Sequence, residues 1–194
     1  MRFWFAILAL LSVLLVHGAS SATQPDTYNR WRRVLIVGDS EACNVATYAW
    51  EVSQELHQHD LIDVACRVGS RVEYWGAQGH LANHLAQHPK PDVVVVFLGT
   101  NHYYERVAPV VAPILDQIEQ QGSSCVWVGN VPVRGHRWPI NGLLRAAVTP
   151  RCTYFDTEAA QIPLADGIHP TVVGAQEWLR KIWPLLPKKD EMTP

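Results

Sequence analysis

The segment Asp92-Val93-Val94-Val95-Val96-Phe97-Leu98, closed by Gly99, is the strongest strand signal in this chain of 194 residues. An unbroken run of β-branched residues is typical of a strand that is buried on both faces of a parallel sheet. Further strands are predicted at the shorter or weaker apolar runs Val34–Val37, Leu61–Ala65, Cys125–Val128 and Thr153–Phe155.

Amphipathic segments lie between these runs. Residues 42–56 and 172–182 carry apolar side chains at helical spacing. A third helix is predicted from near Pro113 to Gly122, because Pro109 and Pro113 together oppose a regular helix through both. Strands that alternate with helices predict an α/β sandwich around a central parallel sheet. The chain has no internal repeat and no sign of a second domain.

The first 22 residues have the layout of a secretory signal peptide. Arg2 supplies a positive charge, residues 3–16 are almost entirely apolar, and Ser20 and Ala22 precede the expected cleavage point. A retained membrane anchor is the alternative, but the apolar run is short for spanning a bilayer. We therefore expect a periplasmic or secreted protein that is not held in the membrane once this segment is removed.

The remaining boundaries follow from composition. A linker is predicted at residues 23–30, one folded domain at 31–187, and a disordered tail at 188–194. The content of 48% hydrophobic and 18% charged residues is typical of a globular domain. The formal net charge of −2 and the scattered basic residues do not favour nucleic acid or an anionic membrane as partner.

Common cofactor motifs are absent from the sequence. It contains neither G-x-G-x-x-G nor a P-loop, so no nucleotide cofactor is expected. It also lacks G-x-S-x-G, which argues against the usual α/β-hydrolase elbow. His80 and His84 have i, i+4 spacing without an H-E-x-x-H motif, and residues 57–60 fit a polar helix end. We predict no metal site.

Polar residues stand where several predicted strands end. Ligands of an open parallel sheet bind beyond the carboxyl ends of the strands, so residues that follow different strands converge there. The residues in question are Asp39 and Ser40 after the first strand, Gly69 after the second, Thr100 and Asn101 after the third, and Asp166 and His169 before the last helix.

Ser40 stands at the junction of a strand and a helix, in Gly38-Asp39-Ser40. Its hydroxyl would lie at the top of the sheet, and its backbone N–H would lie near the positive end of the helix. Both features suit a nucleophile that generates an oxyanion. Asp and Ser are also preferred helix caps, and the tripeptide taken alone is more typical of a plain cap.

The segment Asp166-Gly167-Ile168-His169 shifts the interpretation toward catalysis. A histidine can take the serine proton and return it to the leaving group. A carboxylate three residues earlier can hold the imidazole tautomer, and Gly167 permits the tight turn that this requires. We therefore predict Ser40, Asp166 and His169 as the catalytic residues.

Two further positions are candidates for an oxyanion hole. Asn101 can direct its side-chain NH₂ toward a tetrahedral oxyanion, and Gly69 can offer a backbone N–H near the same point. Turn roles are the alternative for both residues. Gly76 and Gly79 remain open as alternatives to Gly69.

Taken together, these segments resemble the SGNH (GDSL-like) hydrolase family. Its four blocks occur in family order within residues 33–184, as Gly38-Asp39-Ser40, Gly69, Gly99-Thr100-Asn101 and Asp166 through His169. The resemblance implies a flavodoxin-like three-layer α/β/α sandwich with a five-stranded parallel sheet. It implies that Ser40 is the nucleophile, His169 the base and Asp166 its orienting acid. It also implies an oxyanion hole made by Ser40, Gly69 and Asn101. Glu41 departs from the family pattern, in which leucine often follows the serine.

The four cysteines include no C-x-x-C pair, so a zinc site on them is poorly supported. Export would place them in an oxidising compartment, where disulfides form. Cys125 and Cys152 begin strands that should be neighbours, and Cys43 and Cys66 lie near the ends of adjacent elements beside the site. We predict the disulfides Cys125–Cys152 and Cys43–Cys66.

The sequence predicts an exported serine esterase that forms an acyl-enzyme on Ser40 and uses no cofactor. For an exported protein that resembles this family, O-acetyl groups on a polysaccharide or cell-wall glycan are the expected substrate. Lipid or thioester acyl chains, and a non-catalytic glycan-binding module on the same scaffold, are the alternatives. Candidate substrate contacts are Trp75, His102, Tyr103 and Trp138, although core packing is the alternative for the tryptophans. The oligomeric state is left open.

Overall fold

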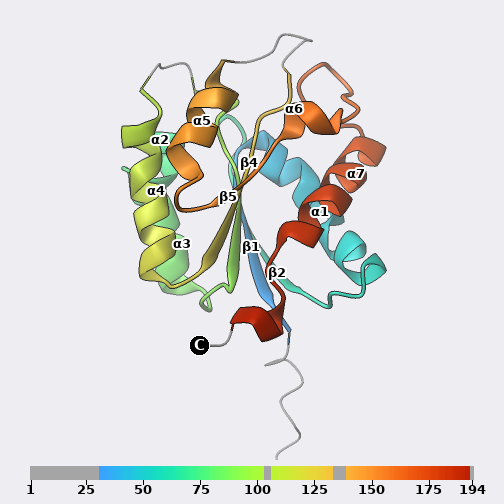
Figure 1. Cartoon of the computed structure of the whole chain (residues 1–194), viewed down its shortest axis with the longest axis horizontal. Coiled ribbons are helices and arrows are strands. Elements are labelled where there is room, and N and C mark those ends of the chain that lie inside the picture. Colours follow the sequence, from blue (N-terminus) through green and yellow to red (C-terminus); the bar gives the residue numbers. More distant parts are fainter. Residues whose placement is uncertain (1–30, 103–105, 133–138, 193–194) are drawn as a thin grey trace, which may run out of the picture.

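The computed structural model describes residues 31–102, 106–132 and 139–192. The predicted signal peptide and linker, together with Tyr103 and Trp138, lie outside these residues. The described part of the chain forms one five-stranded sheet between two layers of helices (Figure 1).

The strands match the sequence prediction to within one residue at each end. All neighbouring strands are parallel, and their order is β2-β1-β3-β4-β5, the flavodoxin-like doubly wound order. The strands are β1 (Arg33–Gly38), β2 (Leu61–Cys66), β3 (Val93–Phe97), β4 (Ser124–Val128) and β5 (Thr153–Phe155).

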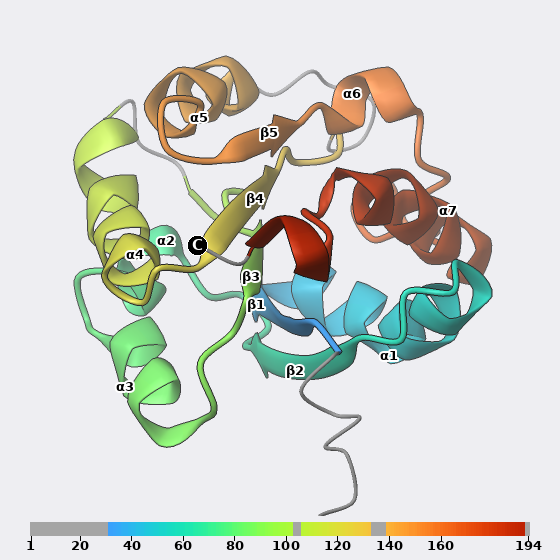
Figure 2. The same cartoon turned by 60° about the horizontal axis from the view of Figure 1, so that its bottom comes forward.

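Two helical layers bury both faces of the sheet. Figure 2 shows α1 and α7 on one side, with α3 and α4 on the other. Leu35 and Val37 of β1 pack toward α2–α5, whereas Val34 and Ile36 pack toward α1 and α7. Burial on both faces is why the central strands are unbroken apolar runs. The helices are α1 (Ser40–Glu55), α2 (Val72–Trp75), α3 (His80–Gln87), α4 (Ala108–Gln120), α5 (Ile140–Val148), α6 (Thr157–Ala160) and α7 (Val172–Ile182), followed by the 3₁₀ turns η2 (Trp183–Leu185) and η3 (Lys189–Met192).

Helix α4 begins earlier than the sequence predicts, so the expected start near Pro113 is wrong. Pro109 lies in the first turn, where its missing N–H would have had no intrahelical partner. Only Pro113 removes a hydrogen bond inside the helix. Burial of the apolar face of α4, which includes Ile114 and Ile118, offsets that loss.

The C-terminal segment packs against the amino-terminal edge of the sheet. Buried Arg32 and Asp60 form a bidentate ion pair, with Nε–Oδ1 and Nη2–Oδ2 distances of 2.8 Å each. Arg32 Nη1 also donates to the carbonyl oxygens of Leu186 and Pro187, at 3.2 and 2.9 Å. This cluster therefore holds together the residues directly before β1 and β2 and the C-terminal segment.

The expected disordered tail at residues 188–194 is wrong for its first part. Lys189–Met192 form η3, and Lys189 Nζ donates to Asp92 Oδ2 at 2.6 Å. Asp92 directly precedes β3, so the tail gains an ionic partner that its own composition does not reveal.

Both predicted disulfides are present. Cys43–Cys66 joins the first turns of α1 to the end of β2, with a Cα–Cα distance of 5.3 Å. Cys125–Cys152 joins β4 to the residue before β5 across 4.7 Å. Both distances suit a disulfide, and the pair is consistent with an oxidising, extracytoplasmic compartment. Within the described ranges, no helix combines the length and the apolar character that a membrane span needs.

Candidate active site

Ser40 is the first residue of α1, directly beyond the carboxyl end of β1. The preceding Asp39 caps the helix, because its Oδ1 accepts the N–H of Glu41 at 3.0 Å. Asp39 is therefore the residue that caps the helix, whereas the Ser40 hydroxyl contacts His169. The Ser40 N–H is at the first helical position, where no intrahelical acceptor exists.

Gly38 allows this junction to form. Its φ is +159°, and a Cβ at this position would collide with the carbonyl oxygen of Phe97 on neighbouring β3. The N–H of Asp39 donates to that same carbonyl at 3.1 Å. A larger residue would push the end of β1, and Ser40 with it, away from β3.

His169 connects Ser40 with Asp166. Its Nε2 lies 3.0 Å from Ser40 Oγ, and its Nδ1 lies 2.8 Å from Asp166 Oδ2. Ser40 and His169 are 129 positions apart in the chain. The structure thus brings the three predicted catalytic side chains together, with the nucleophile within hydrogen-bond reach of the base and the base oriented by a carboxylate.

The loop that carries Asp166 and His169 is ordered by its own hydrogen bonds. Asp166 Oδ1 accepts the backbone N–H groups of His169 at 2.7 Å and Ile168 at 2.9 Å. Gly167 has a φ of +80°, which fits the tight turn between them. The His169 backbone N–H, the His169 side chain and the Ile168 N–H together hold the pKa of Asp166 below its usual range. Asp166 is therefore a carboxylate at neutral pH, suited to orient an imidazole.

The side chain of Asn101 joins the segments that follow three strands. Its Nδ2 donates to Asp39 Oδ2 and to the carbonyl oxygen of Ser70, both at 3.2 Å. Ser70 follows Gly69, and its Oγ donates to the carbonyl oxygen of Gly38 at 3.4 Å. Asn101 and the residue after Gly69 are thus hydrogen-bonded to Asp39 and Gly38, the two residues that precede the nucleophile.

Of the three candidate glycines, Gly69 is the one next to Ser70, which contacts Gly38 and Asn101. It has a φ of +73°, and the space where a Cβ would lie is open. By contrast, a Cβ at Gly76 would touch Ile114 and Pro113 of α4. Gly79 is the N-cap of α3. The position next to Ser70 therefore favours Gly69 over the other two candidates.

Two buried carboxyl groups, Asp39 and Glu41, flank Ser40 in sequence. They are 0% and 1% exposed. Burial raises the pKa of Asp39 to about 7, although hydrogen bonds from the Glu41 N–H and from Asn101 oppose that rise. Burial first, and then the charge of Asp39, raise the pKa of Glu41 well above its ordinary value. The pair therefore retains protons into the neutral range. The sequence shows a carboxyl group on each side of the serine, but only the tertiary structure shows that both groups are buried.

Two of the predicted substrate contacts, Trp75 and His102, are buried. Trp75 is 5% exposed, and its Nε1 donates to Ser70 Oγ at 2.9 Å, so it supports the loop from beneath. His102 is 1% exposed, with Nδ1 3.7 Å from Glu73 Oε1. Trp75 is thus packed in the core, which was the alternative to a substrate contact. Tyr103 and Trp138 lie outside the described residues.

A polar groove of about 420 Å³ opens beside Gly69 and Ser70. The Arg67 guanidinium lies 4.6 Å from the centroid of the Tyr74 ring, which in turn stacks on His80 at 3.7 Å. Besides Arg67 and Tyr74, the groove is lined by Val68, Arg71, Glu73 and Gln78. Charged and amide side chains thus predominate on the wall next to the candidate oxyanion hole.

No protein-family model and no curated protein sequence matches this chain. Solved structures do. TesA aligns with a TM-score of 0.59 and 21% identity, over 79% of this chain and 97% of TesA. The psychrotrophic esterase EstA from Pseudoalteromonas sp. aligns with a TM-score of 0.58 and 14% identity, over 79% and 94%. A member of the lipolytic protein G-D-S-L family from Veillonella parvula aligns with a TM-score of 0.56 and 14% identity, over 79% and 97%. The chain therefore has the fold of the SGNH (GDSL-like) hydrolases.

Proposed function

We propose that this chain is a serine ester hydrolase that acts through an acyl-enzyme on Ser40. The observation that carries the proposal is the hydrogen-bonded series from Ser40 Oγ through both nitrogens of His169 to Asp166. A binding protein has no need for a hydroxyl, an imidazole and an ionised carboxylate in this order. The fold shared with lipolytic proteins adds support at the level of architecture.

The reaction follows from these positions. His169 Nε2 takes the proton of Ser40 Oγ as that oxygen bonds to the acyl carbon. His169 then returns the proton to the departing alkoxide, and an alcohol leaves. A water molecule, deprotonated by the same nitrogen, attacks the acyl-enzyme, and the acid leaves as Ser40 regains its proton. Asp166 orients the imidazole and stabilises its charged form.

The oxyanion would receive hydrogen bonds from the backbone N–H groups of Ser40 and Gly69 and from Asn101 Nδ2. In the free protein both amide hydrogens of Asn101 have acceptors, on Asp39 and on the Ser70 carbonyl. The oxyanion must therefore displace or share one of them. A negatively charged oxygen competes well for such a donor, whereas a neutral ester carbonyl does not. This difference favours the transition state over the bound substrate.

For the substrate we propose a small acyl group, such as acetyl, on a polar carrier such as a carbohydrate or cell-wall glycan. The groove beside Gly69 supports this choice, because Arg67, Arg71 and Glu73 line it. A long acyl chain needs an apolar channel to bury its methylene groups. Long lipid or thioester acyl chains are therefore the second candidate. The disulfides and the predicted signal peptide support an exported enzyme.

The first test compares wild type and Ser40→Ala on a chromogenic acetyl ester. We expect hydrolysis by wild type and background rates for the variant, with unchanged melting temperatures. An organophosphonate ester should also add to Ser40 of wild type, detected by mass spectrometry, and not to Ser40→Ala. Equal rates for the two proteins would refute the enzyme assignment and leave a glycan-binding module in its place.

A second assay separates the two substrate classes. Esters from acetyl to decanoyl are compared by kcat/KM on wild type. We expect the value to fall as the chain lengthens, because the polar groove offers little apolar surface. A preference for the longer esters would contradict the small-acyl proposal while leaving the serine mechanism intact.

A further inference from the structure

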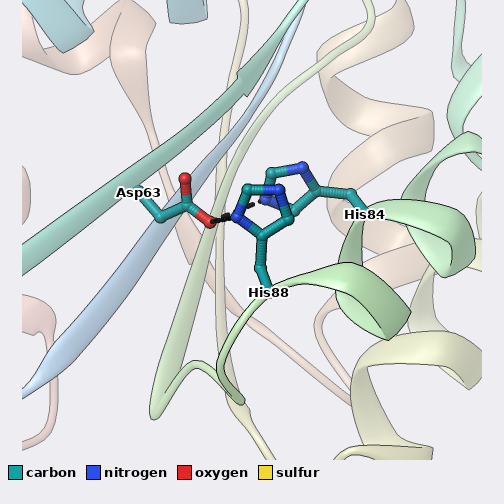
Figure 3. A group of neighbouring side chains, drawn as sticks. All are labelled: Asp63, His84 and His88. Carbon is teal, nitrogen blue, oxygen red and sulfur yellow. Dashed lines mark hydrogen bonds and ion pairs between the residues drawn. The ribbon is translucent and has the colours of Figure 1, made fainter.

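A second cluster of titratable side chains lies away from Ser40, between the edge of the sheet and α3. Asp63 belongs to the edge strand β2 and lies opposite Leu35 of β1 in the register. It is three residues before the end of β2, about 10 Å along the strand from the catalytic rim. Figure 3 shows its carboxylate directed toward His84 of α3 and His88, the residue that caps this helix.

The three side chains converge on one carboxylate oxygen. Asp63 Oδ2 lies 2.7 Å from His84 Nε2 and 3.1 Å from His88 Nδ1. The two imidazole rings are stacked, with centroids 3.9 Å apart and an interplanar angle of 14°. One oxygen and two nitrogens therefore lie within 4.8 Å of one another. The i, i+4 spacing in the sequence suggests that His84 lies beside His80. In the structure His84 instead stacks on His88 and contacts Asp63 of β2, a residue that helical periodicity does not relate to α3.

This donor set is that of a divalent transition-metal ion. Two imidazole nitrogens and one carboxylate oxygen are ligands that Zn²⁺ takes in protein sites, with a water in the fourth position. Bonds of about 2.0–2.1 Å in a tetrahedral site place ligand atoms about 3.3 Å apart. The contacts of Asp63 Oδ2 to His84 Nε2 and His88 Nδ1 are shorter than this by about 0.6 and about 0.2 Å, and the two rings are stacked. The side chains must therefore move apart, and the rings must turn, to admit the ion.

The surroundings permit binding. Asp63 and His88 are about 40% exposed, so an ion and its water ligand can reach the cluster. The cluster borders a cavity of about 170 Å³ between β1, β2 and the end of α3. Arg33 lines the same cavity, and its positive charge lowers the affinity for a cation without occupying a ligand position.

We propose that Asp63, His84 and His88 form a Zn²⁺ site that ties the edge strand β2 to α3. The site is independent of the proposed esterase chemistry, because no residue of the catalytic series belongs to it. Binding of the ion to the folded state alone raises the melting temperature by mass action. The ion would thus reinforce β2, an edge strand that pairs only with β1.

The test uses the full chain without a polyhistidine tag, stripped with EDTA and titrated with ZnCl₂ in a calorimeter. We expect one Zn²⁺ per chain and a higher melting temperature. His88→Ala and Asp63→Asn should each weaken binding by more than about tenfold, since each removes a ligand. His57→Asn, which removes an exposed histidine outside the cluster, is the matched control and should bind as wild type does.

One further measurement makes the result decisive. Co²⁺ in place of Zn²⁺ should give the visible absorption of a tetrahedral site in wild type and in Ser40→Ala, which separates this proposal from the esterase proposal. The proposal is overturned if wild type binds no Zn²⁺ up to millimolar concentration. It is equally overturned if binding persists unchanged in His88→Ala and Asp63→Asn, since the cluster would then be only a hydrogen-bonded histidine pair.

Discussion

Asp39 Oδ2 accepts a hydrogen bond from Asn101 Nδ2 at 3.2 Å, which ties the residue before the nucleophile to the proposed oxyanion donor. The carboxyl group orients the amide and also caps α1 through its other oxygen. Because it is buried, however, its ionised form is costly, and its pKa is raised to about 7. The position of the amide near Ser40 therefore has a cost in stability that depends on pH.

This cost leads to a prediction for Asp39→Asn. The folded pKa of Asp39 is about 7, against about 3.9 in the unfolded chain. Between these pH values the folded state binds more protons, so the Asp39 contribution to stability declines as pH rises from about 4 to about 7. Asparagine cannot titrate, so the variant should lack this part of the decline. Urea unfolding at pH 4.5, 6.0 and 7.5 measures the difference, and parallel pH profiles would contradict it.

The orienting role of Asp166 is tested by Asp166→Asn. The amide would face His169 Nδ1 with the wrong hydrogen-bond character, and kcat should fall by roughly 10³- to 10⁴-fold. The melting temperature should change little, because the Asp166 side chain is 55% exposed. Asp116→Asn, an exposed aspartate paired with Arg151, serves as the control and should retain full activity. A loss below tenfold would exclude the role of Asp166.

The role of Asn101 is tested by Asn101→Ala. Removing one oxyanion donor should lower kcat by about 10²- to 10³-fold and leave KM nearly unchanged, because the hydrogen bond forms in the transition state. Asn83→Ala, on the exposed side of α3, is the control and should match wild type. A rise in KM at constant kcat would instead assign Asn101 to substrate binding.

The two disulfides should differ in their effect on catalysis. They close segments of 23 and 27 residues, so loss of either should destabilise the protein by about 3 kcal/mol in the chain-entropy model. The double variant Cys125→Ser with Cys152→Ser should keep kcat, because that bond lies at the amino ends of the strands. Cys43→Ser with Cys66→Ser should also reduce kcat, since it frees α1 from the strand that leads to Gly69. Chemical unfolding and ester hydrolysis measure the two effects, and equal kcat values for both double variants would contradict this distinction.

Asp60→Ala should be among the most destabilising single substitutions. Asp60 is buried and accepts hydrogen bonds from Arg32, from Ser53 Oγ at 3.0 Å and from Trp183 Nε1 at 2.7 Å. Its removal leaves the Arg32 charge buried without its partner, at a cost of about 3–5 kcal/mol. The exposed pair of Asp116 and Arg151 is the comparison, and Asp116→Ala should cost less than about 1 kcal/mol. Similar unfolding free energies for both variants would count against the buried ion pair.

Much of the architecture followed from local sequence patterns. The β-branched run before Gly99 and the shorter runs before Gly38 and Gly129 predicted strands to within one residue. Parallel strands end at a common edge, so the sequence alone assigns the polar residues that follow them to one site. The two disulfides could be paired because each joins elements that the strand order makes adjacent.

Patterns failed where a side chain's partner comes from elsewhere in the chain. Because of Pro109 and Pro113, the sequence predicts that α4 begins near Pro113, whereas the helix begins at Ala108. The burial that offsets the loss at Pro113 depends on neighbouring elements, which the helix sequence does not show. Residues 188–194 are expected from sequence to be a disordered tail because the ionic partner of Lys189 is Asp92, which precedes β3 and is distant in sequence. Trp75 is a candidate substrate contact by sequence, but in the structure it is buried and its Nε1 donates to Ser70 Oγ.

The sequence by itself determined the order of strands and helices and the residue types at the rim, because hydrophobic periodicity and turn chemistry act over a few neighbouring residues. Only the tertiary structure decided which polar groups lose contact with water and which distant side chains meet. The burial of Glu41 and the approach of Asp63 to His84 and His88 are of this kind. Desolvation and donor geometry depend on distances through space, and those are set when the helical layers close over the sheet.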